Sequence, residues 1–578
     1  MCGIVGTASF KETVILDTLD RVAGRLAHRG PDSQGLWRSP DGQVALGHRR
    51  LSVLDLSQAA RQPMTSPDGR HTIVFNGEIY NFATLRSELQ GLGHRFTSTG
   101  DTEVLLAAYA QWGEDCLQRL NGMFAFVIHD QGHAGRPASL FMARDRAGEK
   151  PLYYQFDERH FAFASELKAL AHSGEIDLQA LNHYLALGYV PGDLCLFRGV
   201  HKLPPGHCAR LDLEHRTLSV RRYWALPPHR PQPGAEGHEL AQRAGLLIED
   251  AVRLRLEADV PVGVLLSGGL DSSLVAAAAA RVSPQPVETF TIALPGSALD
   301  EAHHAQKVAS HFGTRHHVLP LDRPSIGLLD GLAPLIDEPI ADSSLLPAWL
   351  VFGLARRHVT VALGGDGGDE LFGGYSDYTT SAADARRLRG LPPVILRAAA
   401  DAAALLPAGV RVRNRLASLR HGAYQQLIWG RPYFDTTLRA RILRREARAA
   451  LDGHLEAPEA FLLGLFSQGI DPLDAMTRTH FGSILPDDFL VKVDRASMAH
   501  SLEVRAPLLD HRLIEFAFSE VPAHWKVEGG QSRRLQRLLG RAWLPPDLDI
   551  QRKQGFSIPV NERLRRRSLA FSNSRFFS

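Results

Sequence analysis

The feature that most constrains this chain is a glycine-rich turn between an apolar run and a helix-forming run. The apolar run covers residues 260–266, an alanine-rich run starts at Leu274, and the turn between them reads Ser267-Gly268-Gly269-Leu270-Asp271-Ser272-Ser273. A strand, a tight turn and a helix in this order leave free backbone N–H groups at the helix N-terminus, where they bind anions. The sequence therefore predicts a strand–turn–helix unit of an α/β sheet.

The side chains of this turn suit a phosphate ligand. Glycines let the backbone approach an anion closely, the serines add hydroxyl donors, and Asp271 carries a carboxylate suited to Mg²⁺. No Gly-Lys-Ser/Thr follows, which excludes a Walker loop. The turn resembles the pyrophosphate loop of the N-type ATP pyrophosphatases, which cleave ATP between the α and β phosphates. The alternative is a glycine-rich turn without a ligand, which the two glycines alone would favour.

Strand-like and helix-like runs alternate from residue 239 onward. Strands are predicted at 260–266, 287–293, 316–319 and 360–363, and helices at 239–257 and 300–312. This alternation predicts a doubly wound parallel sheet, whose ligands lie at the carboxyl ends of the strands. The last strand runs into a second glycine-dense turn that carries Asp366, Asp369 and Glu370. The spacing fits no EF-hand, and Asp369 could share a Mg²⁺ with Asp271.

The second residue, Cys2, is a candidate nucleophile. Removal of Met1 would leave its thiol beside its own α-amine, whose pKa of ~8 suits a general base. This is the chemistry of N-terminal nucleophile hydrolases, although a cysteine also occurs at this position by chance. The chain has four cysteines, and their spacing indicates neither a zinc site nor a disulfide framework.

Five motifs in the first third of the chain strengthen this interpretation. They are Cys2-Gly3-Ile4-Val5-Gly6, His28-Arg29-Gly30-Pro31-Asp32, Arg50-Leu51-Ser52, Asn76-Gly77-Glu78-Ile79-Tyr80-Asn81 and Gly100-Asp101-Thr102-Glu103. Together they resemble the glutaminase domain of class II glutamine amidotransferases. The resemblance spans essentially the whole first third of the chain.

Chemistry gives several of these residues a role, and the resemblance implies the same roles. The Asn76 amide and the Gly77 N–H form a donor pair for the oxyanion created when Cys2 attacks a carboxamide. Arg50 can bind the α-carboxylate of glutamine, whereas Asp101 and Glu78 can bind its α-ammonium. Asp101 could also be the N-cap of a helix over residues 102–110.

Other stretches carry a second resemblance. Residues 337–344, 501–510 and 551–556, with the two glycine-rich turns, look like the synthetase domain of glutamine-hydrolysing asparagine synthetases. The combined resemblance covers nearly the entire chain. It implies an α+β N-terminal nucleophile hydrolase sandwich followed by an α/β doubly wound parallel-sheet ATP pyrophosphatase domain with a helical C-terminal part. We expect a glutaminase domain at 1–210, a linker at 211–238 and the synthetase domain at 239–578.

The resemblance also implies the ligands of the second domain. Asp271 and Asp369 would hold Mg²⁺, and Asp366 would handle a proton when ammonia attacks. The residues implied to bind ATP or its pyrophosphate are Leu265, Ser267, Gly268, Gly269, Asp271, Ser272, Ser273, Ile292, Gly365 and Lys553. Two departures are a glycine at Gly364, where many relatives have serine, and a short tail after Pro559. Farther upstream, Arg144 and Asp145 are expected to form an ion pair.

The implied enzyme is a carbon–nitrogen ligase with glutamine as amido donor. It would convert L-aspartate into L-asparagine with ATP as co-substrate and Mg²⁺, releasing AMP, pyrophosphate and glutamate. One alternative is an amidotransferase that acts on a different carboxylate, on a cell-surface sugar or peptide. Another is a glutaminase or sensor with a crippled synthetase domain, which Gly364 and the short tail would favour.

The net charge and the hydropathy of the chain limit the kinds of partner that it is expected to bind. The 578 residues carry a formal net charge of +2, without a long apolar segment or a basic leader. We therefore expect a cytoplasmic protein with small-molecule substrates, a homodimer as its candidate assembly, and neither nucleic acid nor a membrane as partner. The arginine-rich region 386–445 alternates arginine with leucine and alanine, which favours a solvated helix face over a nucleic-acid site.

Overall fold

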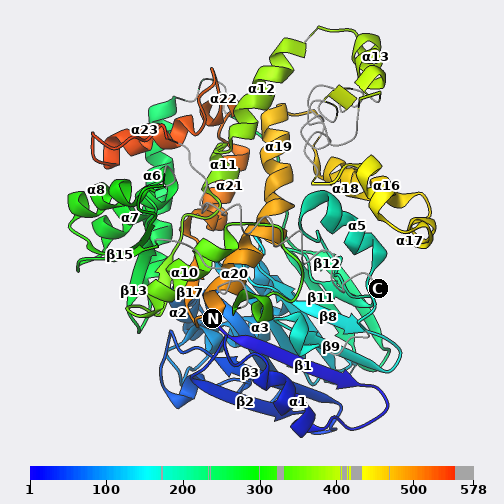
Figure 1. Cartoon of the computed structure of the whole chain (residues 1–578). Helices are drawn as coiled ribbons and strands as arrows, with labels where there is room; N and C mark the ends of the chain where they lie inside the picture. Colours follow the sequence, from blue (N-terminus) through cyan, green and yellow to red (C-terminus); the bar gives the residue numbers. More distant parts are fainter. Residues whose placement is uncertain are drawn as a thin grey trace.

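The computed structural model describes residues 1–552 apart from 134, 171–173, 232–233, 235, 298–299, 322–330, 389, 404, 407–412, 414–415, 418, 420–432 and 468 (Figure 1). A first part built on antiparallel sheets is followed by a second part built on a parallel sheet. In this portion of the chain, none of the helices combines the length and the apolar composition that a bilayer crossing needs.

The first part contains two six-stranded sheets in which every neighbouring pair of strands is antiparallel. One sheet has the order β10-β8-β9-β1-β3-β2, with bounds Val200–Lys202, Tyr153–Phe156, His160–Ala164, Gly3–Ser9, Val44–Arg50 and Ser33–Arg38. The other has the order β12-β11-β7-β6-β5-β4, with bounds Thr217–Arg222, His207–Asp212, Ser139–Arg144, Gly122–Asp130, His71–Ile79 and Met64–Thr65. Alternating apolar residues fill the space between the sheets, among them Ile4, Leu46, Val127 and Met142.

Helices cover the outer faces of both sheets. Helix α1 (Leu16–Gly24) packs on the first sheet, and α2 (Phe82–Gly91) and α3 (Asp101–Trp112) pack on the second. This layering confirms the predicted α+β sandwich. Strand β12 lies inside the stretch expected to be a linker and pairs with β11 over its whole length. We therefore propose that the first domain ends after Arg222 rather than at residue 210.

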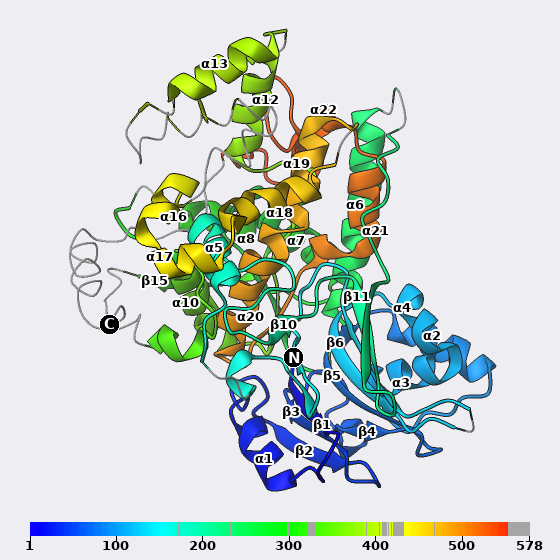
Figure 2. The ribbon, with the colours of Figure 1, turned by 90° about the vertical axis from the view of Figure 1, so that its right-hand side faces the viewer.

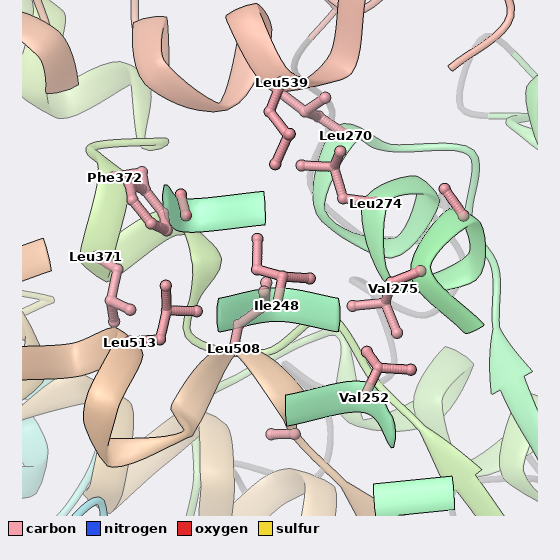
Figure 3. Packing of buried hydrophobic residues seen from close by; sticks show 14 of the residues in the cluster. Ile248, Val252, Leu270, Leu274, Val275, Leu371, Phe372, Leu508, Leu513 and Leu539 are labelled. Atoms are coloured by element: carbon pink, nitrogen blue, oxygen red, sulfur yellow. The ribbon is translucent and has the colours of Figure 1, made fainter. Parts of the chain in front are cut away.

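The second part is built on a five-stranded parallel sheet with the order β15-β14-β13-β16-β17. The strand bounds are Arg315–Pro320, Glu288–Ala293, Val262–Leu265, Val361–Leu363 and Glu503–Arg505. Helices α6 (Gly237–Leu256), α7 (Leu270–Val282) and α23 (Arg534–Trp543) share one core, whereas α10 (Leu345–Arg356) and α20 (Leu490–Met498) build another. Figure 3 shows Ile248 of α6 and Leu274 of α7 in the first of these cores. The predicted doubly wound sheet is confirmed.

The second part contains further helices. They include α8 (Ala302–Phe312), α11 (Gly368–Phe372), α12 (Ser376–Leu388), α13 (Pro393–Ala403), α16 (Thr436–Ile442), α17 (Arg445–Ala450), α18 (Ala457–Leu465), α19 (Pro472–Phe481), α21 (His511–Ser519) and α22 (Ala523–Lys526). Of these, α8, α11 and α21 join the core of α6 and α7, while α12 and α13 extend away from the sandwich (Figure 2). Helix α4 (Cys116–Arg119) and α5 (Leu178–Leu187) belong to the segment before β12. The two parts meet in an apolar cluster that joins Met1, Leu51 and Met123 to Val361 and Met498.

Candidate functional site

Cys2 lies just before β1, buried where the two parts of the chain meet. Its backbone N–H donates to Oδ1 of Asn76 at 2.9 Å, and its Sγ lies 3.9 Å from the carbonyl oxygen of Leu51. Burial raises the pKa of the thiol, and the nearby positive amino terminus opposes this shift. The thiol therefore needs a base before it can act as a nucleophile at neutral pH.

Asn76 and Gly77 lie in the middle of β5, next to Cys2. The Oδ1 of Asn76 accepts the N–H of Cys2. The Nδ2 of Asn76 is buried and lacks a hydrogen-bond partner within the described residues. A Cβ added at Gly77 would lie 2.0 Å from the carbonyl oxygen of Met123, so only glycine fits at this position. Both residues pair with β6 and belong to the strand.

The predicted ligands of glutamine surround this pair. The Arg50 guanidinium donates to the carbonyl oxygens of Leu54, Asp55 and Ser57, which fixes the turn after β3. Asp101 is the first residue of α3, and its Oδ2 accepts the N–H of Ile79 at 2.8 Å. Gly100 is the N-cap of that helix. The N-cap alternative for Asp101 is therefore wrong.

The acidic residues of this site carry perturbed pKa values. Burial raises the pKa of Asp101 to about 6, with a further contribution from Glu503. Burial and the neighbouring Glu503 also raise the pKa of Glu78 well above its usual range. Carboxylates that are buried close together favour a cation between them, because it removes their mutual repulsion. This pattern suits the ammonium group of an amino acid.

The second part contributes two charged residues that sequence reasoning missed. Glu503 of β17 pairs with the amino terminus of Met1, and Arg505 donates its Nε to Glu503 at 2.7 Å. The other end of Arg505 lies 3.6 Å from Glu78. All of these side chains are buried, so β17 completes the charge balance of a site in the other domain. The only sequence signal was their place in the stretch 501–510.

A second site opens at the carboxyl ends of β13, β14 and β16. It is a cavity of about 460 Å³ whose walls include most of the residues implied to bind ATP: Leu265, Ser267, Gly268, Gly269, Asp271, Ser272, Ile292 and Gly365. Asp366 and Asp369 also line it. Ser273 is fully buried in α7 and is absent from the walls. Lys553 lies outside the described residues.

The glycine-rich turn has the geometry of an anion-binding loop. Gly268 has a φ of +81°, and a Cβ there would lie 2.5 Å from the backbone nitrogen of Ala305. Gly269 caps α7, so the N-terminus of this helix faces the turn. The hydroxyls of Ser267 and Ser272 lie 3.0 Å apart. The turn sits between β13 and β16, where the order of the parallel strands reverses.

Asp271 and Asp369 lie on either side of one guanidinium. Nη1 of Arg533 is 3.0 Å from Oδ2 of Asp271 and 3.8 Å from Oδ1 of Asp369. Both carboxylates can therefore face one cation. In the described part of the chain, no three His, Cys, Asp or Glu side chains are grouped to hold a metal ion alone. Two carboxylates completed by ATP phosphates are a usual Mg²⁺ site, so these residues fit that ion.

Gly364 and Asp366 adjoin the glutaminase side of the cavity. The N–H of Gly364 donates to the carbonyl oxygen of Arg505 at 2.8 Å. A Cβ at position 364 would lie 2.7 Å from Oδ2 of Asp366, so a serine there would displace this carboxylate. Burial raises the pKa of Asp366. The glycine at position 364, where many relatives have serine, thus leaves room for the Asp366 carboxylate and does not distort the turn.

The end of the cavity near α20 is built around one lysine. Nζ of Lys492 lies 2.8 Å from Oδ2 of Asp342 and 2.8 Å from Oγ of Ser344. Tyr375 donates its hydroxyl to Oε1 of Glu370 at 2.5 Å, and burial raises the pKa of Glu370 to about 8. The cavity wall therefore contains the ion pair of Lys492 with Asp342 and, separately, a Glu370 carboxyl that is largely neutral at pH 7. Such a pair can recognise a ligand that carries both charges.

Comparison with known proteins matches each part of the chain to a protein family. The profile of the glutamine amidotransferase domain matches residues 1–224, and the asparagine synthase profile matches residues 244–574. The chain belongs to the asparagine synthase family. It is 30% identical to asparagine synthetase [glutamine-hydrolyzing] 1 of Bacillus subtilis, covering 98% of this chain and 88% of that protein. Asparagine synthetase B [glutamine-hydrolyzing] of Escherichia coli is 33% identical over 65% of each chain.

Membership of the asparagine synthase family makes the chain a ligase with a glutamine amidotransferase domain, and it implies ATP as a co-substrate. Asparagine synthetase [glutamine-hydrolyzing] 3 of Bacillus subtilis is similar over most of its length too, with 32% identity over 96% of this chain and 87% of that protein. Among solved structures, glutamine phosphoribosylpyrophosphate amidotransferase from B. subtilis gives a TM-score of 0.30 at 15% identity, covering 66% of this chain and 77% of that chain.

Proposed function

We propose that this asparagine synthase family member amidates a carboxylate through an acyl-adenylate, with L-aspartate as acceptor and glutamine as nitrogen donor. The products would be asparagine, glutamate, AMP and pyrophosphate. The observation that carries the proposal is the link between the two sites. Strand β17 reaches the glutaminase site through Arg505, which lies 3.6 Å from Glu78, and the Arg505 carbonyl oxygen accepts the N–H of Gly364 in the turn of the cavity.

In the glutaminase half, removal of Met1 exposes the α-amine of Cys2, which takes the thiol proton. The thiolate attacks the carboxamide carbon of glutamine, and the oxyanion accepts hydrogen bonds from Asn76 Nδ2 and the Gly77 N–H. Ammonia leaves with a proton returned by the amine, and water hydrolyses the thioester to glutamate. Arg50 binds the α-carboxylate of glutamine, while Asp101 and Glu78 bind its ammonium.

In the synthetase half, an acceptor carboxylate oxygen attacks the α-phosphorus of ATP, and the bond to the β-phosphate oxygen breaks. The loop with Ser267 and Ser272 holds the departing pyrophosphate, and Arg533 balances its charge. Mg²⁺ held by Asp271 and Asp369 would neutralise charge on the phosphates. Ammonia then attacks the acyl carbon, AMP leaves, and Asp366 accepts the proton that the nitrogen loses.

The acceptor is proposed from the pair Lys492 and Asp342. Aspartate would place its α-carboxylate on Lys492 and its ammonium on Asp342, and present its side-chain carboxylate to the α-phosphate. Each cation in the described cavity wall is already next to a carboxylate: Lys492 to Asp342, Arg533 to Asp271 and Arg552 to Glu301. A carboxylate on a peptide that carries a nearby amine meets the same conditions, so it is the second candidate.

Pyrophosphate release from purified protein with Mg-ATP and ammonium tests this function. Release that requires aspartate and yields asparagine would support the proposal. Release that requires another amine-bearing acid would move the acceptor to the second candidate. Glutamine hydrolysis without pyrophosphate release for any acid would favour the crippled synthetase.

A further inference from the structure

The motif His28-Arg29-Gly30-Pro31-Asp32 has no role in the proposed reaction. Its arginine, Arg29, is fully buried where the two parts of the chain meet. Nη1 of Arg29 lies 2.7 Å from Oδ2 of Asp494 and Nη2 lies 2.8 Å from Oδ1, so the two side chains form a bidentate ion pair. Asp494 belongs to α20 of the second part and is also buried. The motif therefore connects the first part to one helix of the second.

Arg29 also contacts the backbone of the candidate nucleophile. Its Nε donates to the carbonyl oxygen of Cys2 at 3.0 Å, while Oδ1 of Asn76 accepts the N–H of the same residue. Neither bond uses an atom of Met1. Once Met1 is removed, Cys2 is the end of the chain and a single peptide bond restrains it, so these two contacts set the direction of its side chain. Figures 1 and 2 both show the amino terminus beside α20.

Asp494 is the carboxylate that fixes the orientation of the Arg29 guanidinium. The other carboxylate next to Arg29 is Glu166, at 2.8 Å from Nη1. Glu166 also lies 3.0 Å from both Lys168 and Arg495, so three basic side chains share its charge. Burial raises the pKa of Asp494, but the Arg29 guanidinium outweighs this effect and holds the pKa below its usual range. A planar guanidinium that is bound through two nitrogens cannot rotate, which determines where its Nε points.

Helix α20 carries Asp494 beside the cavity of the second part. Lys492 and Val493, the two residues before Asp494, line the cavity wall, and Lys492 forms the ion pair with Asp342. Residues two positions apart on a helix do not face the same way, so α20 presents Lys492 to the cavity and Asp494 to Arg29. One turn of this helix therefore contacts the proposed acceptor site on one side and the residue that holds Cys2 on the other.

We propose that Asp494 is a positioning residue for Cys2: it fixes the Arg29 guanidinium, and Arg29 fixes the carbonyl oxygen of Cys2. The inference rests on the proposed role of Cys2 as nucleophile. Without the Asp494 carboxylate, the guanidinium can turn and release that oxygen, and the thiol then lies off the line of attack on the carboxamide. A misplacement of about 1 Å lowers a rate by about a hundredfold. Glutamine would still bind, because backbone groups hold its proposed ligands Arg50 and Asp101.

Asp494→Asn tests this role, because asparagine keeps the shape of the side chain and removes its charge. The kcat for glutamine hydrolysis should fall about a hundredfold, while the KM for glutamine should stay close to that of the parent protein. Ammonia-dependent pyrophosphate release from the same preparation should also stay close to that of the parent, since ammonia bypasses Cys2. This second rate shows that the variant is folded.

A double-mutant cycle asks whether Asp494 acts through Arg29. Arg29→Lys keeps the positive charge, but an ammonium cannot bind the carboxylate and the Cys2 carbonyl oxygen in one planar geometry. If both residues act through one contact, R29K/D494N should lose little more kcat than the more damaged single variant. Losses that multiply would show that Asp494 acts independently of Arg29, and they would overturn the proposal.

Asp487→Asn is the matched control at the same interface. Asp487 is a buried carboxylate of the second part that faces a buried cation of the first, Lys202, at 3.8 Å. It accepts the N–H of Gly192, and in the described structure it has no contact with Arg29 or Cys2. The variant removes the same charge from the same interface, so its kcat for glutamine hydrolysis should match that of the parent.

Three results would refute the role of Asp494. They are a kcat of D494N within about threefold of the parent, an equal fall in its glutamine-dependent and ammonia-dependent rates, or an equal loss in D487N. A raised KM with an unchanged kcat would also refute it, because the pair would then serve glutamine binding. A parent protein that does not hydrolyse glutamine contradicts the proposed function itself, whereas an active parent with an unaffected D494N contradicts only the positioning role.

Discussion

Replacing Asn76 tests the oxyanion assignment, because its amide has two separable roles. Oδ1 accepts the N–H of Cys2 at 2.9 Å, and Nδ2 is a buried donor without a partner among the residues described. Asn76→Asp keeps the acceptor oxygen and removes the donor, whereas Asn76→Ala removes both. Loss of one oxyanion donor lowers kcat by about 10²–10³-fold, or about 2.7–4 kcal/mol. Both variants should lose that much glutamine-dependent turnover.

The two variants should differ in stability. Asn76→Ala leaves the buried Cys2 nitrogen, which is the α-amine once Met1 is removed, without its acceptor, and this costs about 1–3 kcal/mol of folding free energy. Asn76→Asp retains the acceptor but adds a carboxyl to a site that already holds Glu78 and Asp101. Its destabilisation should therefore grow as the pH rises, since the added carboxyl must ionise among like charges. Denaturant unfolding at two pH values separates the two costs.

The assay compares glutamine-dependent with ammonia-dependent pyrophosphate release from the same protein preparation. Only the first should fall, because ammonia bypasses the oxyanion. Gln118→Ala is the matched control, since Gln118 is also an amide that donates to a backbone carbonyl, that of Tyr223, at 2.9 Å. A glutamine-dependent rate that drops less than tenfold in Asn76→Asp would refute the oxyanion role. An equal drop in both rates would show that Asn76 acts on the fold and not on the reaction.

Four further outcomes are expected. Cys2→Ala should abolish glutamine-dependent turnover and spare ammonia-dependent turnover, measured as asparagine formed. Because the pKa of Asp101 is raised to about 6, its carboxyl becomes protonated below that pH and can no longer pair with an ammonium. The KM for glutamine should therefore rise as the pH falls below about 6. Asp101→Asn should make the KM for glutamine less dependent on pH. Arg533→Met should raise the KM for ATP at least tenfold, with partial recovery in Arg533→Lys, measured by ATP–pyrophosphate exchange. Lys492→Met should raise the KM for the acceptor and leave glutamine hydrolysis unchanged.

The sequence predicted those features whose signals are local. Glycine and serine after an apolar run predict the turn Ser267–Ser273. The alternation of strands and helices then predicts that this turn lies at the carboxyl edge of the sheet. Contacts between distant segments carry no such signal. Arg533 lies beside Asp271 only because α23 packs against α6 and α7. The charge of Arg533 alone does not distinguish it from the chain's other arginines.

Two local expectations failed for a common physical reason. Asp145 accepts N–H groups from Ala147, Gly148, Glu149 and Lys150, and Arg144 donates to backbone carbonyl oxygens, so the expected ion pair is replaced by bonds to the backbone. Asp101 likewise bonds to the N–H of Ile79 and not to its own helix. Buried backbone N–H and C=O groups need hydrogen-bond partners, and here the charged side chains of Arg144, Asp145 and Asp101 supply them.

Strands β16 and β17 connect the two candidate sites of the chain. Leu363 pairs with Arg505, and the next residue, Gly364, donates to the Arg505 carbonyl oxygen, so the turn that holds Asp366 is fixed to the strand that holds Glu503. Arg505 of the same strand also lies 3.6 Å from Glu78 in the candidate glutamine site. A displacement of either strand would move groups in both sites together. We infer that the short β17, and not the longer strands of either sheet, fixes the separation of the two candidate sites.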